Sequence, residues 1–299
     1  MKLKCVPTSA DSPGLGEFEL IRQFFASARC AQASAGVELG IGDDCALLAL
    51  SAGEQLAVST DTLVAGVHFP EGADAFLLAQ RGLAAAASDL AAMGAAPLGF
   101  TLALTLPAAD PVWLRAFAQG LDRMAQLCGL ALVGGDTTRG PLSLTFTVIG
   151  CVPIGQALTR SGAQAGDLVR VETATQTADD LLCVGGSLGD AAAALPLVLR
   201  QATAEPEIAQ ALLARYWTPQ PQLALGLALR GKATAALDIS DGLLADCTHL
   251  ATASGVAVHI ELPLLPIAKA ALALLGEARA QHCALAGGDD YRLLFSLPV

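Results

Sequence analysis

The sequence of 299 residues is poor in basic side chains. Lysine and arginine together number 17, against 28 aspartates and glutamates, which gives a formal net charge of −11 at pH 7. A negative surplus of this size disfavours binding to nucleic acid or to an anionic membrane surface. We therefore expect neither as a partner. A small anionic ligand is expected only where metal ions or local cations compensate the charge.

The eight cysteines lack the spacing of a metal site or of a redox pair, because no two of them form a CxxC motif. In a chain of this length we expect free thiols in a reducing compartment. The N-terminal segment MKLKCVPTSADSPG carries positive charge but no apolar run of the kind found in signal peptides. The sequence therefore predicts a cytoplasmic protein.

One uncharged stretch, Leu90 to Ala109, is nominally long enough to cross a membrane. It contains two glycines and two prolines, and residues 100–106 partly alternate between apolar and small polar side chains. These features predict a helix end, a turn and a buried strand rather than a membrane-spanning helix.

Aspartate beside small residues is what the sequence has in abundance. Nine aspartates fall in six short motifs without lysine or arginine: 42–44 (GDD), 59–62 (STDT), 88–89 (SD), 134–138 (GGDTT), 238–242 (DISDG) and 287–291 (GGDDY). Carboxylate and hydroxyl oxygens suit Mg²⁺, which usually shares its ligand shell with water and substrate phosphates. The pattern predicts an enzyme that uses Mg²⁺ to handle phosphate.

Each motif alone is weak evidence, because Asp-Gly and Asp-Asp pairs commonly mark turns and helix caps. The six together are stronger, since two carboxylates about 4 Å apart repel by roughly 4 kcal/mol at an effective dielectric near 20. Bound cations reverse the sign of that interaction. Residues 226–233 nearly match a P-loop, but Ala233 stands where that motif needs Ser or Thr, so we reject it.

Strands and helices alternate in both halves of the chain, which predicts α/β or α+β domains. Helices are expected over residues 18–27, 75–92, 113–128, 190–199 and 222–229. Strands are expected over residues 56–60, 100–106, 130–133, 142–151, 167–171, 236–242, 256–262 and 291–297. Several aspartates directly follow expected strands and should converge on one sheet edge. The preferred domain boundary is Val152-Pro153-Ile154-Gly155.

Five longer motifs occur in a fixed order: GIGDDCA (40–46), STDTLVAGVHF (59–69), SDLAAMGA (88–95), GGDTTRG (134–140) and LTRSG (158–162). Together they resemble the bacterial thiamine-monophosphate kinase family, and the resemblance runs from about Gly16 to Leu297. It implies transfer of the γ-phosphate of ATP to thiamine phosphate, giving thiamine diphosphate.

The resemblance also implies a two-domain fold like that of aminoimidazole ribonucleotide synthetase. Residues 16–152 would form an N-terminal domain that binds ATP and Mg²⁺ and whose sheet pairs across a homodimer. Residues 153–299 would form a C-terminal domain, expected to be truncated at its C-terminal end because relatives continue for some tens of residues.

The resemblance assigns roles to individual residues. Several Mg²⁺ ions would be held by Asp44, Ser59, Thr60, Asp61, Asp89, Asp136, Asp238 and Asp241. ATP would be contacted by Gly135, Asp136, Arg160 and Ser240. Thiamine phosphate would be contacted by His68 and Asp289, where the family usually has glutamate. An acidic residue suits the permanently cationic ring of thiamine.

No catalytic side chain is implied, because the acceptor phosphate is already an anion and direct in-line transfer needs charge neutralisation and positioning. On residue type alone, His68 is more typical of a core or surface histidine, and Arg160 is equally consistent with a solvated charge. Two other functions stay open: another ATP-using member of the same superfamily, such as a ligase, or a non-catalytic nucleotide-binding protein. A ligase would need a nucleophile near the N-terminus, for which Cys5 is a weak candidate.

Overall fold

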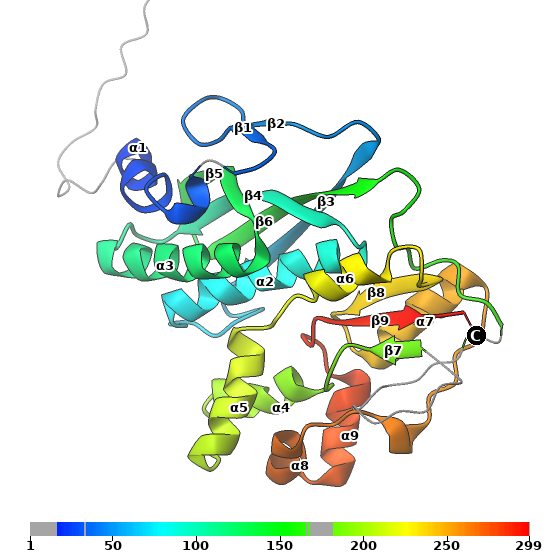
Figure 1. The fold of residues 1–299 in the computed structure, drawn as a ribbon. Coiled ribbons are helices and arrows are strands. Elements are labelled where there is room, and N and C mark those ends of the chain that lie inside the picture. The colour runs from blue at the N-terminus through cyan, green and yellow to red at the C-terminus, as the bar shows by residue number, and fades with distance from the viewer. Residues whose placement is uncertain (1–16, 33, 166, 168–181, 299) are drawn as a thin grey trace, which may run out of the picture.

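A computed structural model describes residues 17–32, 34–165, 167 and 182–298. Its first half builds a four-stranded sheet in the order β3-β6-β4-β5 (Figure 1). The strands are β3 (Glu54–Val64), β4 (Ala96–Leu106), β5 (Ala131–Arg139) and β6 (Ser143–Pro153). β6 runs antiparallel to both neighbours, whereas β4 and β5 are parallel. A short strand pair, β1 (Val37–Leu39) and β2 (Leu47–Leu48), precedes this sheet in the chain.

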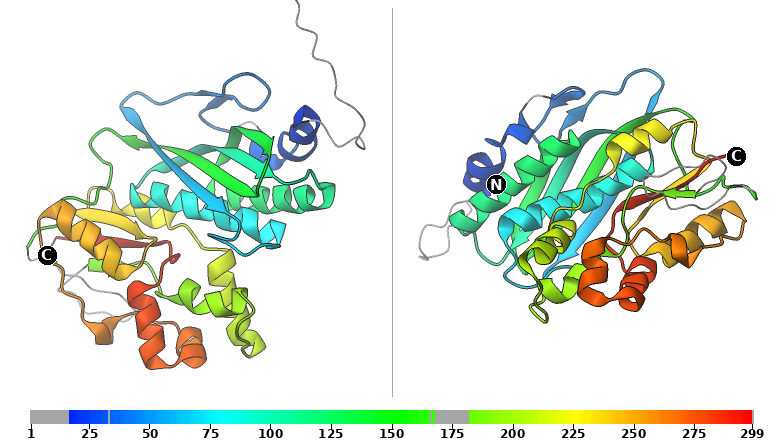
Figure 2. Two further views of the ribbon diagram at one scale, coloured as in Figure 1. Left: turned by 180° about the vertical axis from the view of Figure 1, so that it is seen from behind. Right: turned by 60° about the horizontal axis from the view of Figure 1, so that its bottom comes forward.

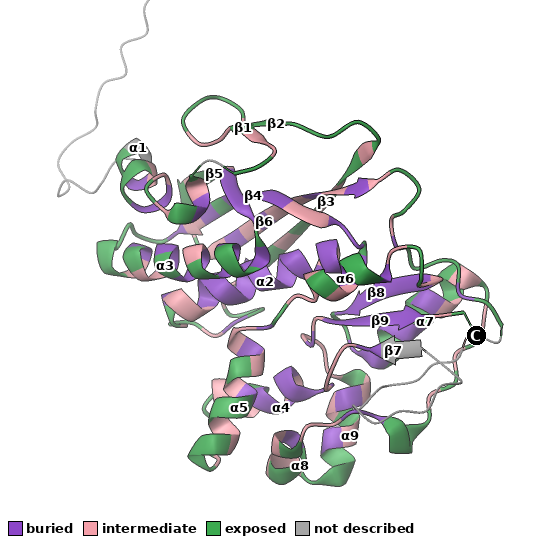
Figure 3. Ribbon diagram, viewed as in Figure 1, coloured by how far each residue is buried: buried purple, intermediate pink, exposed green. Residues whose placement is uncertain are grey.

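Helix α2 (Ala75–Ala92) begins where Asp74 accepts a hydrogen bond from the Leu77 N–H at 2.9 Å. That side chain satisfies a backbone donor that the first turn leaves unpaired. The helix is rich in alanine and leucine, and almost all of it is buried (Figure 3). The buried residues of this helix include the charged Arg81 and the polar Ser88.

Helix α3 (Pro111–Cys128) lies beside α2 and covers the same face of the first sheet. Asp110 caps its first turn through the Val112 N–H at 2.9 Å, and Gly129 ends it in the left-handed conformation with φ 68°. At the N-terminus, α1 (Glu17–Leu20) continues as a π-helical turn over Ile21–Phe25. Phe25 packs edge-on against Phe117 of α3, with ring centroids 6.4 Å apart.

The second half forms a three-stranded antiparallel sheet in the order β7-β9-β8. Its strands are β7 (Leu182–Val184), β8 (Ala235–Ile239) and β9 (Arg292–Ser296). Its helices are α4 (Asp190–Val198), α5 (Pro206–Trp217), α6 (Leu223–Leu229), α7 (Leu243–Ser254), α8 (Lys269–Leu275) and α9 (Glu277–Ala286). Figure 2 shows both halves from two further directions.

The two faces of the second sheet pack against different helices. Leu237 and Ile239 share a core with residues of α7. Ala236, Leu293 and Phe295 instead pack against the C-terminal end of α2 and against α6. Helix α2 therefore lies between the two sheets, and polar groups on it can meet side chains from both halves of the chain (Figure 1).

The first sheet has a helix-covered face and an open face. Phe146 and Leu102 pair across β6 and β4, and both are buried on the helix side. Thr60 pairs with Thr147 in the next row, and because side chains alternate along a strand, both threonines lie on the opposite, open face.

The helices expected over residues 75–92, 113–128, 190–199 and 222–229 are present, with ends shifted by at most two residues. The uncharged stretch Leu90 to Ala109 is a helix end, a turn and strand β4, as predicted. Among the described residues, no helix is both long and apolar enough to cross a membrane.

Other predictions about the elements were wrong. No strand forms over residues 256–262. Val256, Val258 and Ile260 pack against the core that Leu237 and Ile239 share with α7, but no strand pairs with them. This packing explains why apolar residues alternate there. The strands at 56–60 and 130–133 are longer than expected and continue as β3 and β5 through Asp61 and Asp136. Helices α5, α7, α8 and α9 were missed. Most of the strand expected at 167–171 lies outside the described residues.

Candidate active site

Carboxylates from both halves of the chain converge beside helix α2. Asp89 on α2 accepts a hydrogen bond from the Ser59 hydroxyl on β3. Burial, and then repulsion from Asp89, raise the pKa of Asp61 on β3 to about 6. The same two causes, in the same order, raise the pKa of Asp238 on β8 to about 7. We call Ser59, Asp61, Asp89 and Asp238 the Asp89 cluster.

No salt bridge involves the Asp89 cluster within the described part of the chain. The salt bridges found there join Arg81 to Asp289 and Arg215 to Asp190, so neither involves the cluster. The Ser88 hydroxyl is buried beside Asp238 without a well-aligned hydrogen bond. Crowded carboxylates without a counter-ion are costly, so this arrangement favours a bound cation.

Thr60 lies between Ser59 and Asp61 in the sequence but on the other face of the sheet. Its hydroxyl is 3.0 Å from the hydroxyl of Thr147 on β6. Ser59 and Asp61 point to the helix side, where Ser59 reaches Asp89. The structure therefore separates the Thr60 side chain from the two neighbours with which it was grouped.

A second group of predicted residues lines a cavity of about 340 Å³ near strand β5. Asp44, Gly135 and Asp136 contribute to its lining. Gly135 has φ 156°, and a Cβ atom at this position would lie 2.0 Å from the Leu102 carbonyl oxygen, so only glycine fits. Part of the apolar wall is formed by Phe25, Leu104 and Leu132.

The strand register relates this cavity to the Asp89 cluster. Asp61 on β3 pairs with Phe146, Phe146 with Leu102, and Leu102 with Gly135 on β5. Asp61 and Gly135 thus lie on one row across the sheet. Three strand spacings separate them, or roughly 14 Å. On the helix side of the sheet, the buried side chains of Phe146 and Leu102 lie between them.

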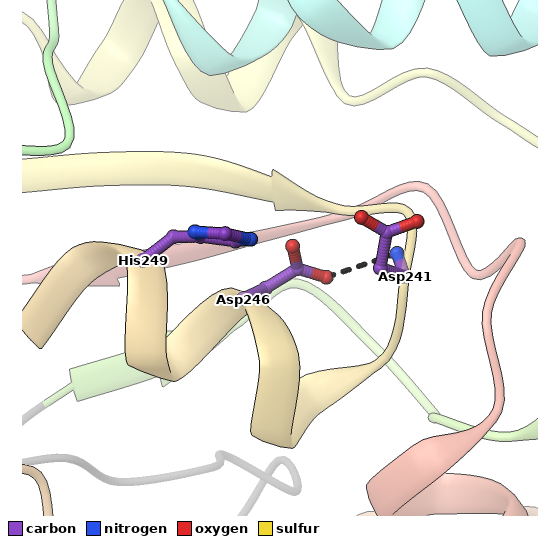
Figure 4. Close-up of side chains that lie close together, drawn as sticks. All are labelled: Asp241, Asp246 and His249. Atoms are coloured by element: carbon purple, nitrogen blue, oxygen red, sulfur yellow. Dashed lines mark hydrogen bonds between the residues drawn. The ribbon is translucent and has the colours of Figure 1, made fainter.

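Asp241 and Ser240 lie on the turn that follows β8. The buried Asp246 carboxylate on α7 accepts hydrogen bonds from the backbone N–H groups of Asp241 at 3.1 Å and Gly242 at 3.2 Å (Figure 4). Ligand-type atoms of Asp241, Asp246 and His249 lie within 4.8 Å of one another. Asp246 therefore fixes the turn that presents Ser240 and Asp241.

Asp289 follows helix α9 and meets a buried arginine from the other half of the chain. Its Oδ2 atom is 2.9 Å from Nη2 of Arg81 on α2, and its Oδ1 atom accepts a hydrogen bond from the Tyr291 hydroxyl at 3.0 Å. Burial, followed by repulsion from Asp289, raises the pKa of Tyr291 well above its usual value, and Asp61 contributes in the same direction. Asp289 is therefore near the Asp89 cluster.

The remaining predicted residues, His68 and Arg160, lie in exposed segments. Nδ1 of His68 accepts a hydrogen bond from the Val64 N–H at 3.0 Å, and its carbonyl oxygen accepts one from the Tyr216 hydroxyl at 3.2 Å. Electrostatic interaction with His68 opposes the rise in the Asp61 pKa, which places His68 near that carboxylate. The Arg160 carbonyl oxygen accepts a hydrogen bond from the Ser254 hydroxyl at 3.0 Å.

Comparison with known proteins identifies the family. Residues 42–152 match the family model described as AIR synthase related protein, N-terminal domain. Thiamine-monophosphate kinase of Escherichia coli K12 is 45% identical over 284 residues, which cover 95% of this chain and 83% of that protein. The enzyme of Haemophilus influenzae is 39% identical over the same length. The chain belongs to the thiamine-monophosphate kinase family.

Solved structures agree with this assignment. The crystal structure of thiamine-monophosphate kinase from Stenotrophomonas maltophilia K279a superposes with a TM-score of 0.83 at 46% identity, covering 95% of this chain and 87% of that one. AaThiL complexed with AMPPCP and TMP gives a TM-score of 0.74 at 29% identity, covering 84% and 77%. The hydrogenase maturation protein HypE shares the fold, with a TM-score of 0.70 at 21% identity.

Sequence reasoning assigned no role to several residues that shape this thiamine-monophosphate kinase family site. They are Arg81, Ser88, Tyr216, Asp246 and Tyr291. A signal was present for Arg81, because it and Asp89 are the only charged residues in the helix Ala75–Ala92. Arg81 and Ser88 are seven positions apart, which places them on one helix face. No comparable signal marked Tyr216, whose role depends on a contact between distant parts of the chain.

Proposed function

We propose that this chain transfers the γ-phosphate of ATP to thiamine phosphate, giving thiamine diphosphate and ADP. Membership of the thiamine-monophosphate kinase family supports this activity, as does the related AaThiL structure, which holds AMPPCP and TMP. The observation that carries the proposal is the Asp89 cluster. Its carboxylates come from both halves of the chain and form no salt bridge among the described residues.

The donor set of this cluster fits Mg²⁺. All its candidate ligands are oxygen atoms, and the carboxylates of Asp61 and Asp238 each interact with that of Asp89. We assign Mg²⁺ binding to Ser59, Asp61, Asp89 and Asp238, with Asp44, Thr60, Asp136 and Asp241 as further ligands. Because the Thr60 side chain lies on the other face, Thr60 can contribute to this cluster only through its backbone. Bound there, Mg²⁺ would neutralise phosphate charge and polarise the transferred group.

The cavity beside β5 is the best place for the nucleoside part of ATP. Its apolar wall suits a base, and Gly135 and Asp136 contribute to the same lining. Ser240 and Arg160 contact ATP in this proposal, and Arg160 adds a directed positive charge.

Thiamine phosphate is assigned to the region around His68 and Asp289. His68 interacts electrostatically with Asp61, and Asp289 interacts with Tyr291, which is near Asp61. The backbones of His68 and Asp289 are tied to Tyr216 and Ser240 respectively. The acceptor oxygen belongs to an anionic phosphate and needs no deprotonation. The chain's residues therefore orient two polyanions for in-line transfer and supply no nucleophile or general base.

Release of ADP, measured with and without thiamine phosphate, tests this function. We expect ADP formation to require Mg²⁺ and thiamine phosphate and to match formation of thiamine diphosphate. ADP release that ignores thiamine phosphate would indicate another ATP-using enzyme. Nucleotide binding without any ADP release would indicate a non-catalytic binding protein.

We also propose two domains, residues 16–152 and 153–299, and a homodimer formed through the N-terminal domain. The open face of the first sheet supports the dimer, because it leaves Leu56 and Val58 on β3 about half exposed. Light scattering should report a dimer at micromolar concentration, and Val58→Lys should shift it toward monomer. A wild-type monomer at that concentration would refute the homodimer.

A further inference from the structure

Arg81 is the most deeply buried charged side chain beside the proposed substrate site, with 2% of its side chain exposed. Its guanidinium is stacked on the Tyr216 ring, 3.8 Å from the centroid, and donates to the Tyr216 carbonyl oxygen at 2.6 Å. Nη2 forms the ion pair with Asp289 at 2.9 Å. Because it is enclosed in this way, Arg81 can act on a ligand only through Asp289.

Asp289 itself is held rigidly on several sides. Its backbone N–H donates to the Ser240 carbonyl oxygen at 2.8 Å, and the Tyr291 N–H donates to the Ile239 carbonyl oxygen at 2.8 Å. Asp289 and Tyr291 both have positive φ values, 68° and 49°, a conformation that non-glycine residues adopt only where surrounding contacts enforce it. The carboxylate is thus presented in one orientation.

The charge of this carboxylate is already balanced. Arg81 pairs with one oxygen and the Tyr291 hydroxyl with the other, while 41% of the Asp289 side chain remains exposed. A carboxylate has about four lone-pair positions, so acceptor capacity remains for a ligand. A ligand cation would gain less here than at an unpaired carboxylate, since drawing Asp289 away would leave a buried arginine uncompensated.

We propose that Arg81 is a positioning residue for thiamine phosphate, holding the Asp289 carboxylate as a hydrogen-bond acceptor for the amino group of the substrate's aminopyrimidine ring. That amino group is the only N–H donor in thiamine phosphate. The inference rests on the proposed function and refines it: Asp289 recognises an N–H donor rather than the positive charge of the thiazolium ring.

Three ligands separate these roles. Thiamine phosphate has both the amino group and the cationic ring. Oxythiamine phosphate keeps the cation but carries an oxo group in place of the amino group. Deazathiamine phosphate keeps the amino group but has a neutral ring. Calorimetry with AMPPCP and Mg²⁺ present gives Kd for each ligand, and steady-state kinetics gives KM and kcat for thiamine phosphate.

We expect the wild-type protein to bind oxythiamine phosphate at least about tenfold more weakly than thiamine phosphate, the scale of a lost hydrogen bond to a charged acceptor. Deazathiamine phosphate should bind within about threefold of thiamine phosphate, because the cation is not what Asp289 recognises. The opposite order, with the neutral analogue weak and the oxo analogue tight, would show that Asp289 acts as a counter-charge and would overturn the inference.

Arg81→Met should raise KM for thiamine phosphate at least about tenfold with a smaller change in kcat and an unchanged KM for ATP, and should erase the discrimination against oxythiamine phosphate. Arg81→Lys, which keeps the charge, should retain part of the discrimination against oxythiamine phosphate. Tyr291→Phe removes the other donor to Asp289 without removing a charge, and should also reduce the discrimination. This variant keeps the test decisive if Arg81→Met does not fold.

Arg230→Met is the matched control. Arg230 also links the two halves of the chain, through a hydrogen bond from Nε to the Gly94 carbonyl oxygen, but it does not pair with Asp289. We expect it to lower stability and leave the discrimination intact. Equal effects of the Arg81 and Arg230 variants would mean that Arg81 only joins the two halves. Failure of wild-type turnover with thiamine phosphate would refute the proposed function instead.

Discussion

Two groups of buried carboxylates in this molecule solve the same electrostatic problem in different ways. In the Asp89 cluster, burial and mutual repulsion raise the pKa values of Asp61 and Asp238. In the second group, which we call the Asp290 cluster, Asp190 and Asp290 lie in the C-terminal half with Arg215 and Arg292. The charge of Arg292 opposes the rise that burial causes in the pKa of Asp290, and Arg215 lies 3.7 Å from Asp190.

The Asp290 cluster therefore carries its own counter-charges. Asp290 also accepts a hydrogen bond from the Gly189 N–H at 2.8 Å, and the Ser187 hydroxyl donates to Asp190. Even so, burial is the largest influence on Asp290 and raises its pKa to about 7. The comparison teaches that burial alone does not mark a metal site. The absence of an arginine counter-charge, among the described residues, distinguishes the Asp89 cluster.

The largest expected effect is on turnover, from Asp61→Asn. Removing one charge-stabilising contact typically costs on the order of 10²–10³ in rate, and we expect a loss of this size at saturating Mg²⁺ with the fold retained. Asp190→Asn, in the Asp290 cluster, should leave kcat within about threefold of wild type. Steady-state kinetics with circular dichroism checks both variants. Near-normal turnover of Asp61→Asn would remove Asp61 from the metal site.

The next effect is on stability, from Arg292→Met. This change removes the cation that faces Asp290, so the free energy of unfolding should fall by on the order of 2 kcal/mol at pH 8. The loss should shrink toward pH 5, because Asp290 can then be protonated. Urea unfolding at the two pH values provides the measurement, and the Mg²⁺ dependence of kcat should be unchanged. A pH-independent loss would contradict charge compensation by Arg292.

A smaller effect links pH and metal. The folded pKa values of Asp61 (about 6) and Asp238 (about 7) exceed the ordinary aspartate pKa of 3.8, so the native state binds more protons than the unfolded state between about pH 4 and 7. Metal-free protein should therefore lose stability as pH rises through that window. Because Mg²⁺ binds the ionised carboxylates, its stabilisation should grow from pH 5 to pH 8.

Two variants divide this pH dependence between the clusters. Asp238→Asn should make the pH dependence of the unfolding free energy the same in EDTA as in Mg²⁺. Asp290→Asn should instead reduce the slope of that pH dependence equally in both conditions. The readout is the unfolding free energy at pH 5–8 with EDTA or with Mg²⁺. Wild-type curves of the same slope in both conditions would show that the Asp89 cluster does not bind the ion.

The sequence predicted these groups unequally, for physical reasons. Helix Ala75–Ala92 was predictable because its cap, composition and terminating glycine are local. The convergence of Asp61, Asp89 and Asp238 came from the motifs and the family resemblance, but the face on which each side chain lies depends on strand register. Thr60 shows this, since one position along β3 reverses the face.

Contacts between segments far apart in the chain were not predictable. Arg81 and Tyr216 are separated by 135 positions, and nothing in either segment indicates the other. The missed helices α8 and α9 have short or weakly amphipathic sequences, and their cores come from packing against α4 and α5. Local patterns therefore gave the elements of the site, and tertiary packing determined its partners.

The smallest expected effect concerns Asp289, which lies between the two cases: it has an arginine partner, as in the Asp290 cluster, yet is 41% exposed. Asp289→Glu lengthens the side chain by one methylene, and its extra rotatable bond lets the carboxylate keep Arg81 while reaching further toward the substrate. We expect KM for thiamine phosphate to fall about threefold, which is under 1 kcal/mol, with kcat unchanged. Steady-state kinetics at saturating ATP measures this. The contrary result is a tenfold rise in KM for Asp289→Glu that disappears in the double variant Asp289→Glu, Arg81→Lys. It would show that the geometry of the ion pair, rather than the reach of the carboxylate, limits recognition.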